Sequence, residues 1–199
     1  MNRMAKSASN LFFTAGVLWV LEAIGEVFGG YVEDFNNIYD YLSEATFGLY
    51  FAAFFTGALY LAKSRHVISG HKLGWLGKIG LVLLGLGAVL MTSKALINVV
   101  YHGFIGNQFL FAEGGPLNPI FLIGGLSFVL GTIVFTIGCI TGKILPWWAA
   151  TLFVLSLFFV FVPVFGKYIA AALYVLIGAL VLKKQENTED IPNNFLANK

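Results

Sequence analysis

Apolar positions along the chain fall into six long runs, and a short polar connector separates each run from the next. A helix that crosses the hydrocarbon core of a bilayer needs about 20 largely apolar residues, and the runs come close to that length. None of them alternates apolar and polar residues, as a transmembrane strand does. The pattern predicts an all-α integral membrane bundle of six transmembrane helices, at residues 11–31, 43–62, 75–100, 119–141, 145–163 and 166–182.

The last two runs are short, so a single fused helix is the alternative. A helix over residues 145–182 would be far too long for one crossing, and Pro163 and Gly166 interrupt the run where a tight turn is needed. The sequence therefore favours two helices joined by a turn. After residue 182 the chain becomes polar, which predicts one transmembrane domain over residues 1–182 and a mobile cytoplasmic tail over residues 183–199.

Basic residues gather on one side of the predicted bundle. They flank the amino terminus, the second and fourth connectors and the carboxyl terminus: Arg3, Lys6, Lys63, Arg65, Lys72, Lys78, Lys143, Lys183 and Lys184. The other side carries Glu33, Asp34, Asp40 and Glu113, and its one basic residue is Lys167. Cytoplasmic connectors of membrane proteins collect Lys and Arg, so both termini are predicted to be cytoplasmic.

Composition and motifs exclude several classes of protein. Hydrophobic residues make up 58% of the chain and charged residues 11%, against about 45–50% and about 25% in soluble domains. The formal net charge is only +2 and the basic residues are scattered, so a nucleic-acid partner has no support. The single cysteine cannot form an internal disulfide or a metal cluster. Without a nucleophile elbow, phosphate loop or dinucleotide fingerprint, we predict no catalytic residue, no cofactor and no metal.

Charged residues inside the predicted helices lie mainly in the first half of the chain, and the spans of the second half are almost free of charge. Glu22 and Glu26 lie four residues apart, on one face of the first helix, and Lys94, Asn98 and His102 repeat this spacing on the third. At a rise of about 1.5 Å per residue, Glu26 and Lys94 both lie about 24 Å from the basic side, so we expect them to pair. Glu22 is then left over. Unpaired charges are costly in a bilayer, so the cluster is either a structural clasp or a ligand or ion site.

Two further features concern possible partners. Glu44 and Glu113 lie on the acidic side of the bundle, where they predict an outer mouth that favours cations. Gly124, Gly131 and Gly138 recur at seven-residue spacing along one face of the fourth helix, where missing side chains allow a second helix to approach closely. That helix belongs either to this chain, or to a membrane protein partner or a second copy.

One segment carries a resemblance to a known group of proteins. Residues 124–155 read GGLSFVLGTIVFTIGCITGKILPWWAATLFVL, and a helix ending at Lys183 and Lys184 follows. A glycine-rich helix ending at a basic residue, then Leu-Pro-x-Trp and a hairpin of two apolar helices, resembles the carboxyl-terminal half of uncharacterised multi-pass bacterial membrane proteins. The resemblance covers residues 124–184. It implies a six-helix fold in a bacterial plasma (inner) membrane, and it implies no activity.

Three functions remain open at this point. The first is a small transporter, a channel-like protein or a membrane receptor for a small cationic or amphipathic ligand, with its site at the charge cluster. The second is a non-catalytic accessory, assembly or immunity-type subunit. The third is an intramembrane enzyme acting on lipid or quinone, which the absence of catalytic motifs disfavours. A cavity that reaches Glu22 would favour the first, and a fully packed cluster would favour the second.

Overall fold

The computed structural model describes residues 3–29, 37–69, 72–104, 118–160, 162 and 165–189, with the backbone alone at residues 65–69, 101–104, 160 and 184–189. These residues form six helices: α1 (Arg3–Gly29), α2 (Ile38–Ser69), α3 (Trp75–Phe104), α4 (Asn118–Thr141), α5 (Trp147–Val160) and α6 (Phe165–Glu189). No strand occurs among the described residues, so the prediction of an all-α protein is confirmed.

Five of the six helices, all except α5, are long and apolar enough to cross a membrane. These helices are consistent with the membrane-embedded character predicted from the apolar runs. Helix α5 has 14 residues and is about 21 Å long, which is less than the hydrocarbon thickness of about 30 Å. It begins after Pro146, whose carbonyl accepts hydrogen bonds from the N–H groups of Ala149 and Ala150. A crossing by α5 stays a prediction.

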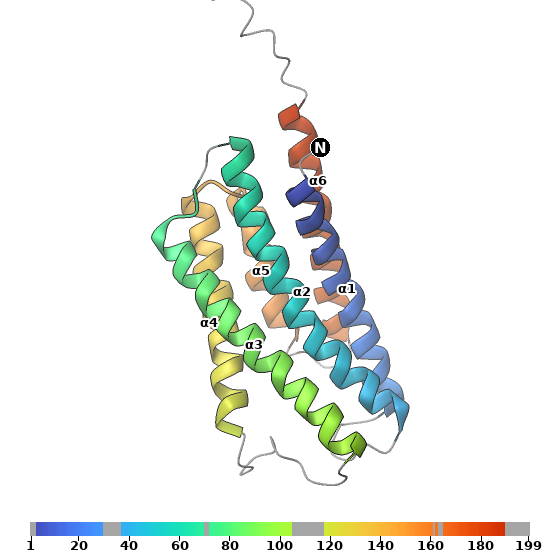
Figure 1. Cartoon of the computed structure of the whole chain (residues 1–199). Coiled ribbons are helices and arrows are strands. Elements are labelled where there is room, and N and C mark those ends of the chain that lie inside the picture. Colours follow the sequence, from blue (N-terminus) through green and yellow to red (C-terminus); the bar gives the residue numbers. More distant parts are fainter. Residues whose placement is uncertain are drawn as a thin grey trace, which may run out of the picture.

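The helices form a closed ring. Each helix packs against the next one along the chain, and α1 packs against α6, so the last helix returns to the first. Helices α1, α3 and α5 run in one direction and α2, α4 and α6 in the other (Figure 1). We call the end of the bundle where α1 begins and α6 ends the proximal end, and the opposite end the distal end. Helix α4 packs less extensively against α5 than against α3.

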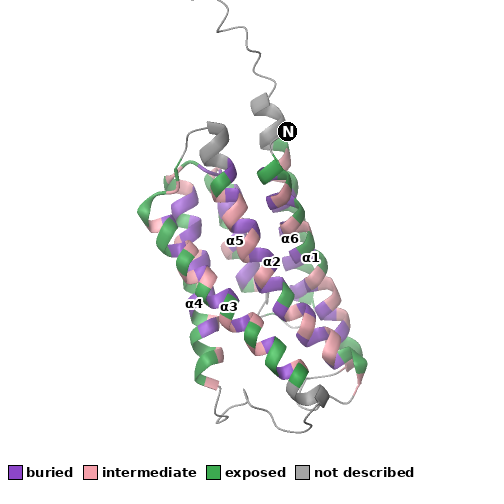
Figure 2. Cartoon of the chain, viewed as in Figure 1, coloured by how far each residue is buried: buried purple, intermediate pink, exposed green. Residues whose placement is uncertain are grey.

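Each helix carries buried and exposed residues along its length (Figure 2), and aromatic rings fill the inside of the ring. The largest buried aromatic side chains are Phe12, Trp19, Tyr50, Phe54, Phe128, Phe135, Phe153 and Tyr174. The two tyrosine hydroxyl groups among them are hydrogen-bonded to each other, whereas Trp19 Nε1 has no hydrogen-bond partner among the described residues. The hydroxyl oxygens of Tyr50 and Tyr174 are 2.5 Å apart, and Ser156 donates to the Tyr174 oxygen at 2.8 Å. These bonds offset the cost of burying hydroxyl groups in an apolar core.

Glycines let two pairs of helices approach closely. A Cβ atom added at Gly131 would lie 2.5 Å from the backbone nitrogen of Leu84, and one at Gly138 would collide with the backbone of Gly77. Gly124 faces the same helix, since its Cβ would lie 2.9 Å from the Cβ of Leu90. Helix α3 therefore occupies the glycine face of α4 within this chain. These three glycines are not free to meet a partner, while a membrane partner through another surface stays a prediction.

The contact between α1 and α6 is equally close. A Cβ atom at Gly16 would lie 2.9 Å from the carbonyl oxygen of Ala171, and the hydroxyl of Ser9 donates to the carbonyl of Gly178 at 2.8 Å. A side chain–backbone hydrogen bond of this kind ties the two helices where water is absent. The first and last helices of the chain are thus held together along their length.

Candidate functional site

A lysine of α6 bridges the two glutamates of α1 at the distal end. The ammonium of Lys167 donates to Glu22 Oε1 and to Glu26 Oε2, each at 2.6 Å. Glu22 and Glu26 share a helix face because they lie four residues apart, so one ammonium reaches both. The side chains of Lys167, Glu22 and Glu26 are 10%, 9% and 18% exposed. All three groups are largely withdrawn from solvent and lipid.

A second ion pair joins α2 to α3 at the same end. Lys94 Nζ lies 2.5 Å from Glu44 Oε1, and the amide of Asn98 donates to the same oxygen at 3.2 Å. Lys94 and Asn98 are one helical turn apart on α3, which lets both reach one carboxylate. Both ion pairs therefore lie at the distal end of the bundle. We call Glu22, Glu26, Glu44, Lys94, Asn98 and Lys167 the charge cluster.

The expected pairing of Glu26 with Lys94 is wrong. Glu26 binds Lys167, and Lys94 binds Glu44. The depth estimate placed Glu26 and Lys94 at one level, but depth does not tell which helices are neighbours. In the ring, α2 lies between α1 and α3, so the glutamate of α2 meets Lys94 first.

The structure places the other residues of the predicted site in different surroundings. Glu44 was expected at an outer mouth, and it is instead 6% exposed and part of the charge cluster. Asn98 is buried beside Lys94, on the face that the spacing indicated. The side chain of His102 and all of Glu113 lie outside the described residues. Lys167 was noted as the one basic residue of the acidic side, but its role as a bridge was missed.

The charge cluster contains more carboxylates than ammonium groups. It holds three glutamates and two lysines. Glu22 Oε2 is buried and has no hydrogen-bond partner among the described residues, although its neighbour Oε1 binds Lys167. A buried acceptor without a donor costs about 1–3 kcal/mol, and more when it is charged. The cluster therefore has one buried acceptor without a donor and one more carboxyl group than ammonium groups.

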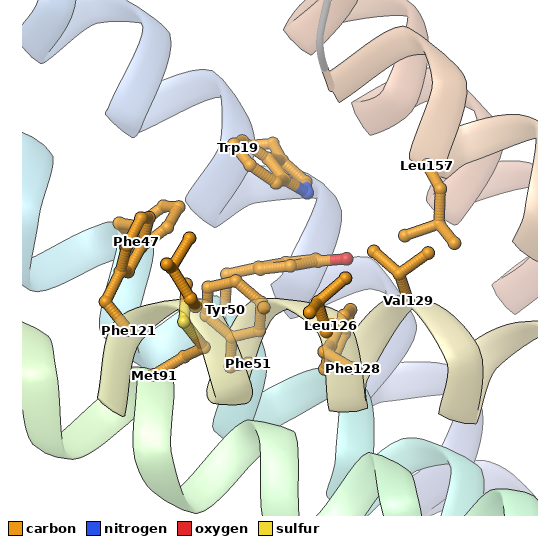
Figure 3. A pocket seen from close by; sticks show the side chains of 12 residues that line it. Trp19, Phe47, Tyr50, Phe51, Met91, Phe121, Leu126, Phe128, Val129 and Leu157 are labelled. Atoms are coloured by element: carbon orange, nitrogen blue, oxygen red, sulfur yellow. The ribbon is translucent and has the colours of Figure 1, made fainter. Parts of the chain in front are cut away.

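An apolar cavity of about 420 Å³ lies beside the charge cluster, inside the ring. Figure 3 shows Trp19 and Tyr50 in its wall, with Phe47 and Phe121 on one side and Val129 and Leu157 on the other. The lining residues come from α1, α2, α3, α4 and α5: Trp19, Phe47, Tyr50, Phe51, Met91, Phe121, Leu122, Gly125, Leu126, Phe128, Val129 and Leu157.

Three aromatic rings belong both to the cavity wall and to the surroundings of the charge cluster. Lys94 Nζ lies 5.4 Å from the ring centroid of Phe47 and 5.6 Å from that of Phe121. Lys167 Nζ lies 5.9 Å from the ring centroid of Trp19. These distances are in the range of cation–π contacts. The cavity thus ends at rings whose other neighbours are the two ammonium groups, although Glu22 itself does not line it.

No set of three or more His, Cys, Asp or Glu side chains in the described part of the chain is placed to hold a metal ion. Comparison of the chain with known protein families, curated proteins and solved structures finds no match. The resemblance of residues 124–184 to multi-pass bacterial membrane proteins consequently stays a prediction. The function has to be argued from the cavity and the charge cluster alone.

Proposed function

We propose that this protein binds an amphipathic membrane molecule that has an apolar body and a cationic polar end. The apolar body occupies the cavity inside the ring, and the cationic end lies in the charge cluster. The proposal rests on three aromatic rings, those of Trp19, Phe47 and Phe121. They line the cavity, and they also contact the ammonium groups of Lys94 and Lys167. An apolar site and a polar site that share a wall suit a molecule with two chemically different ends.

The cavity supports the apolar half of the proposal. Its volume of about 420 Å³ lies in the range of about 300–1,000 Å³ typical of ligand pockets. Protein interiors are close-packed, so an apolar space of this size inside a bundle is a candidate site for an apolar ligand. Leu122 and Leu126 of α4 line the cavity and are 52% and 63% exposed on the outer surface. A membrane molecule can therefore approach from the bilayer past α4, on the side of its less extensive contact with α5.

The charge cluster supports the cationic half. Three carboxylates surround two ammonium groups, and Glu22 Oε2 is buried without a donor. A ligand ammonium group supplies both the missing charge and the missing hydrogen bond. Of a transporter, a channel-like protein and a receptor, the charge cluster favours a receptor or carrier over an open channel. The reason is that the ammonium groups of Lys94 and Lys167 are already held in ion pairs.

A second function has a specific observation in its favour. The charge cluster is largely buried and its lysines are paired, as expected of a structural clasp in a non-catalytic accessory, assembly or immunity-type subunit. In that function the cavity has no specific occupant, and a side chain that fills it leaves the binding of a cationic amphiphile unchanged. The experiment below separates the two functions on this point.

Substitution of Gly125 by leucine is expected to abolish binding of a cationic amphiphile. Gly125 lines the cavity, and a Cβ atom there meets no heavy atom within 4 Å, so leucine enters without displacing the backbone. The probe is tetradecylammonium, whose N–H groups can donate hydrogen bonds, titrated into protein in a maltoside detergent and followed by thermal unfolding. We expect binding at least about tenfold weaker than in the unchanged protein, because the side chain takes the place of the apolar body.

The matched control is Val82→Leu, an exposed position on α3 away from the cavity, which should bind the probe as the unchanged protein does. Tetradecanol and tetradecyl sulfate test the charge of the head group, and Glu22→Gln should weaken the preference for the cationic probe. Equal binding of all three probes, or undiminished binding in Gly125→Leu, would overturn the ligand proposal. That outcome favours the accessory function.

We also propose six crossings with both termini cytoplasmic, in the plasma (inner) membrane of a bacterium. The proximal end carries Arg3, Lys6, Lys63, Lys72 and Lys143, which suits the cytoplasmic side of a membrane. Although α5 is short, it packs between α4 and α6, both of which are long enough to cross. A crossing by α5 brings the fourth connector and the end of α6 to the same side.

Cysteine labelling in intact cells tests this topology. Asn36→Cys should react with a membrane-impermeant maleimide in intact cells, and Asn198→Cys only after the cells are permeabilised. The native Cys139 is fully buried, so the unchanged protein should give little background. Reaction of Asn198→Cys in intact cells contradicts the proposed orientation.

A further inference from the structure

The proximal end has a groove that the proposed function does not use. It lies between α2 and α3, has a volume of about 450 Å³, and is lined by Lys63, Lys72 and Lys78 together with Leu59, Ala62, Leu73 and Leu81. All three lysines are exposed. The groove thus combines three ammonium groups with an apolar floor, at the end of the bundle opposite to the charge cluster.

These lysines pair with no carboxylate among the side chains that the structure describes. The sequence contains no Asp or Glu between Glu44, which lies at the distal end, and Glu113. No ion pair of Lys63, Lys72 or Lys78 occurs among the described residues, and the ion pairs that do occur join other groups at the distal end. Neighbouring elements at the proximal end add Arg3, Lys6 and Lys143. These basic residues and the groove lysines outnumber Glu186 and Glu189 at the end of α6, so the surrounding potential is positive as well.

The depth of the groove in the bilayer is marked by Trp75. This side chain, at the start of α3, is 70% exposed and lies one turn before Lys78. Tryptophan with this degree of exposure at a helix end favours the headgroup layer of a membrane. The lysines therefore lie at the level of lipid phosphates, while Leu59 and Leu81 are further along α2 and α3 towards the hydrocarbon.

We propose that this groove binds an anionic phospholipid, with the phosphate held by Lys63, Lys72 and Lys78 and an acyl chain lying along Leu59 and Leu81. Three unpaired cations above an apolar floor complement an anionic head on an apolar tail. A lysine near an anionic membrane surface attracts such lipids, and three of them around one groove act on a single headgroup. This inference does not depend on the ligand proposed for the cavity.

The test compares phosphatidylglycerol with phosphatidylcholine of the same acyl chains, titrated into the full-length protein in maltoside and measured by native mass spectrometry. The unchanged protein should bind phosphatidylglycerol at least about tenfold more tightly. Combined substitution of Lys63→Gln, Lys72→Gln and Lys78→Gln should reduce this preference to near unity. The control Arg3→Gln, Lys6→Gln and Lys143→Gln removes the same charge outside the groove and should keep the preference.

Two further measurements make the result decisive. Raising the salt concentration should weaken phosphatidylglycerol binding to the unchanged protein and leave phosphatidylcholine binding unchanged, which tests the charge contribution without any variant. Inorganic phosphate at millimolar concentration should not displace the lipid. Displacement by free phosphate, equal losses in the two triple variants, or a preference that does not depend on salt would each overturn the proposal.

Discussion

Replacing Lys167 with methionine is expected to destabilise the protein by about 3–5 kcal/mol, since removing one partner of a buried ion pair leaves an uncompensated charge. Here one ammonium serves two carboxylates, at 2.6 Å from each. Without it, Glu22 and Glu26 face each other on one side of α1 with no donor from α6. Thermal unfolding in detergent, monitored by size-exclusion chromatography of heated samples, measures the loss.

The rescue variant distinguishes a charge effect from a packing effect. Adding Glu22→Gln and Glu26→Gln to Lys167→Met should recover much of the lost stability, because removing all partners of a buried pair can be close to neutral. Lys94→Met is the comparison. It leaves one carboxylate, Glu44, without its ammonium partner, and Glu44 keeps its hydrogen bond from Asn98, so the loss of stability should be smaller. If the glutamine substitutions recover no stability, Lys167 does not stabilise the protein through its ion pairs.

The second large effect is expected from Gly131→Leu. A Cβ atom at this position lies 2.5 Å from the backbone nitrogen of Leu84 and 3.0 Å from its Cα. Backbone atoms cannot rotate away, so α3 and α4 have to separate along their shared face. Overpacking of a core typically costs about 1–3 kcal/mol, and a collision with backbone should exceed that range. We expect little folded, monodisperse protein, measured by fluorescence-detected size-exclusion chromatography.

The same substitution six positions earlier on α4 is the control. Gly125→Leu meets open space, so its yield and thermal stability should match those of the unchanged protein. The pair therefore separates the position of the glycine from the general effect of leucine on α4. Unchanged stability of Gly131→Leu would show that this face of α4 meets lipid instead of α3.

The helices were predictable because each depends on a local pattern. An apolar run of sufficient length specifies a helix wherever it packs, and only the ends shifted: residues 145–163 were predicted where α5 spans Trp147–Val160. Pro146 accounts for the later start, since proline is tolerated at the beginning of a helix. The four-residue spacing was equally informative, because Glu22 and Glu26 share a partner and so do Lys94 and Asn98.

The pairing and the cavity were not predictable in the same way, because both depend on which helices are neighbours. The sequence places Glu26 and Lys94 at one depth, yet α2 stands between their helices and α6 returns to α1. One signal was available. Lys167 is the single basic residue on an otherwise acidic side and lies near the end of the bundle that holds Glu26. The cavity depends on how side chains from five helices meet, and no periodicity in the sequence predicts that.

The bridge from Lys167 to α1 also affects how the chain is made. Its two bonds join residues that are 145 and 141 positions apart, so Glu22 and Glu26 leave the ribosome with the first helix and their partner with the last. During most of synthesis α1 holds two carboxylates without an ammonium, at a cost of roughly 2.5–3.5 kcal/mol for each acidic charge deep in the bilayer. A nascent or truncated chain that lacks α6 keeps this free-energy penalty. We expect membrane proteases to degrade such a chain.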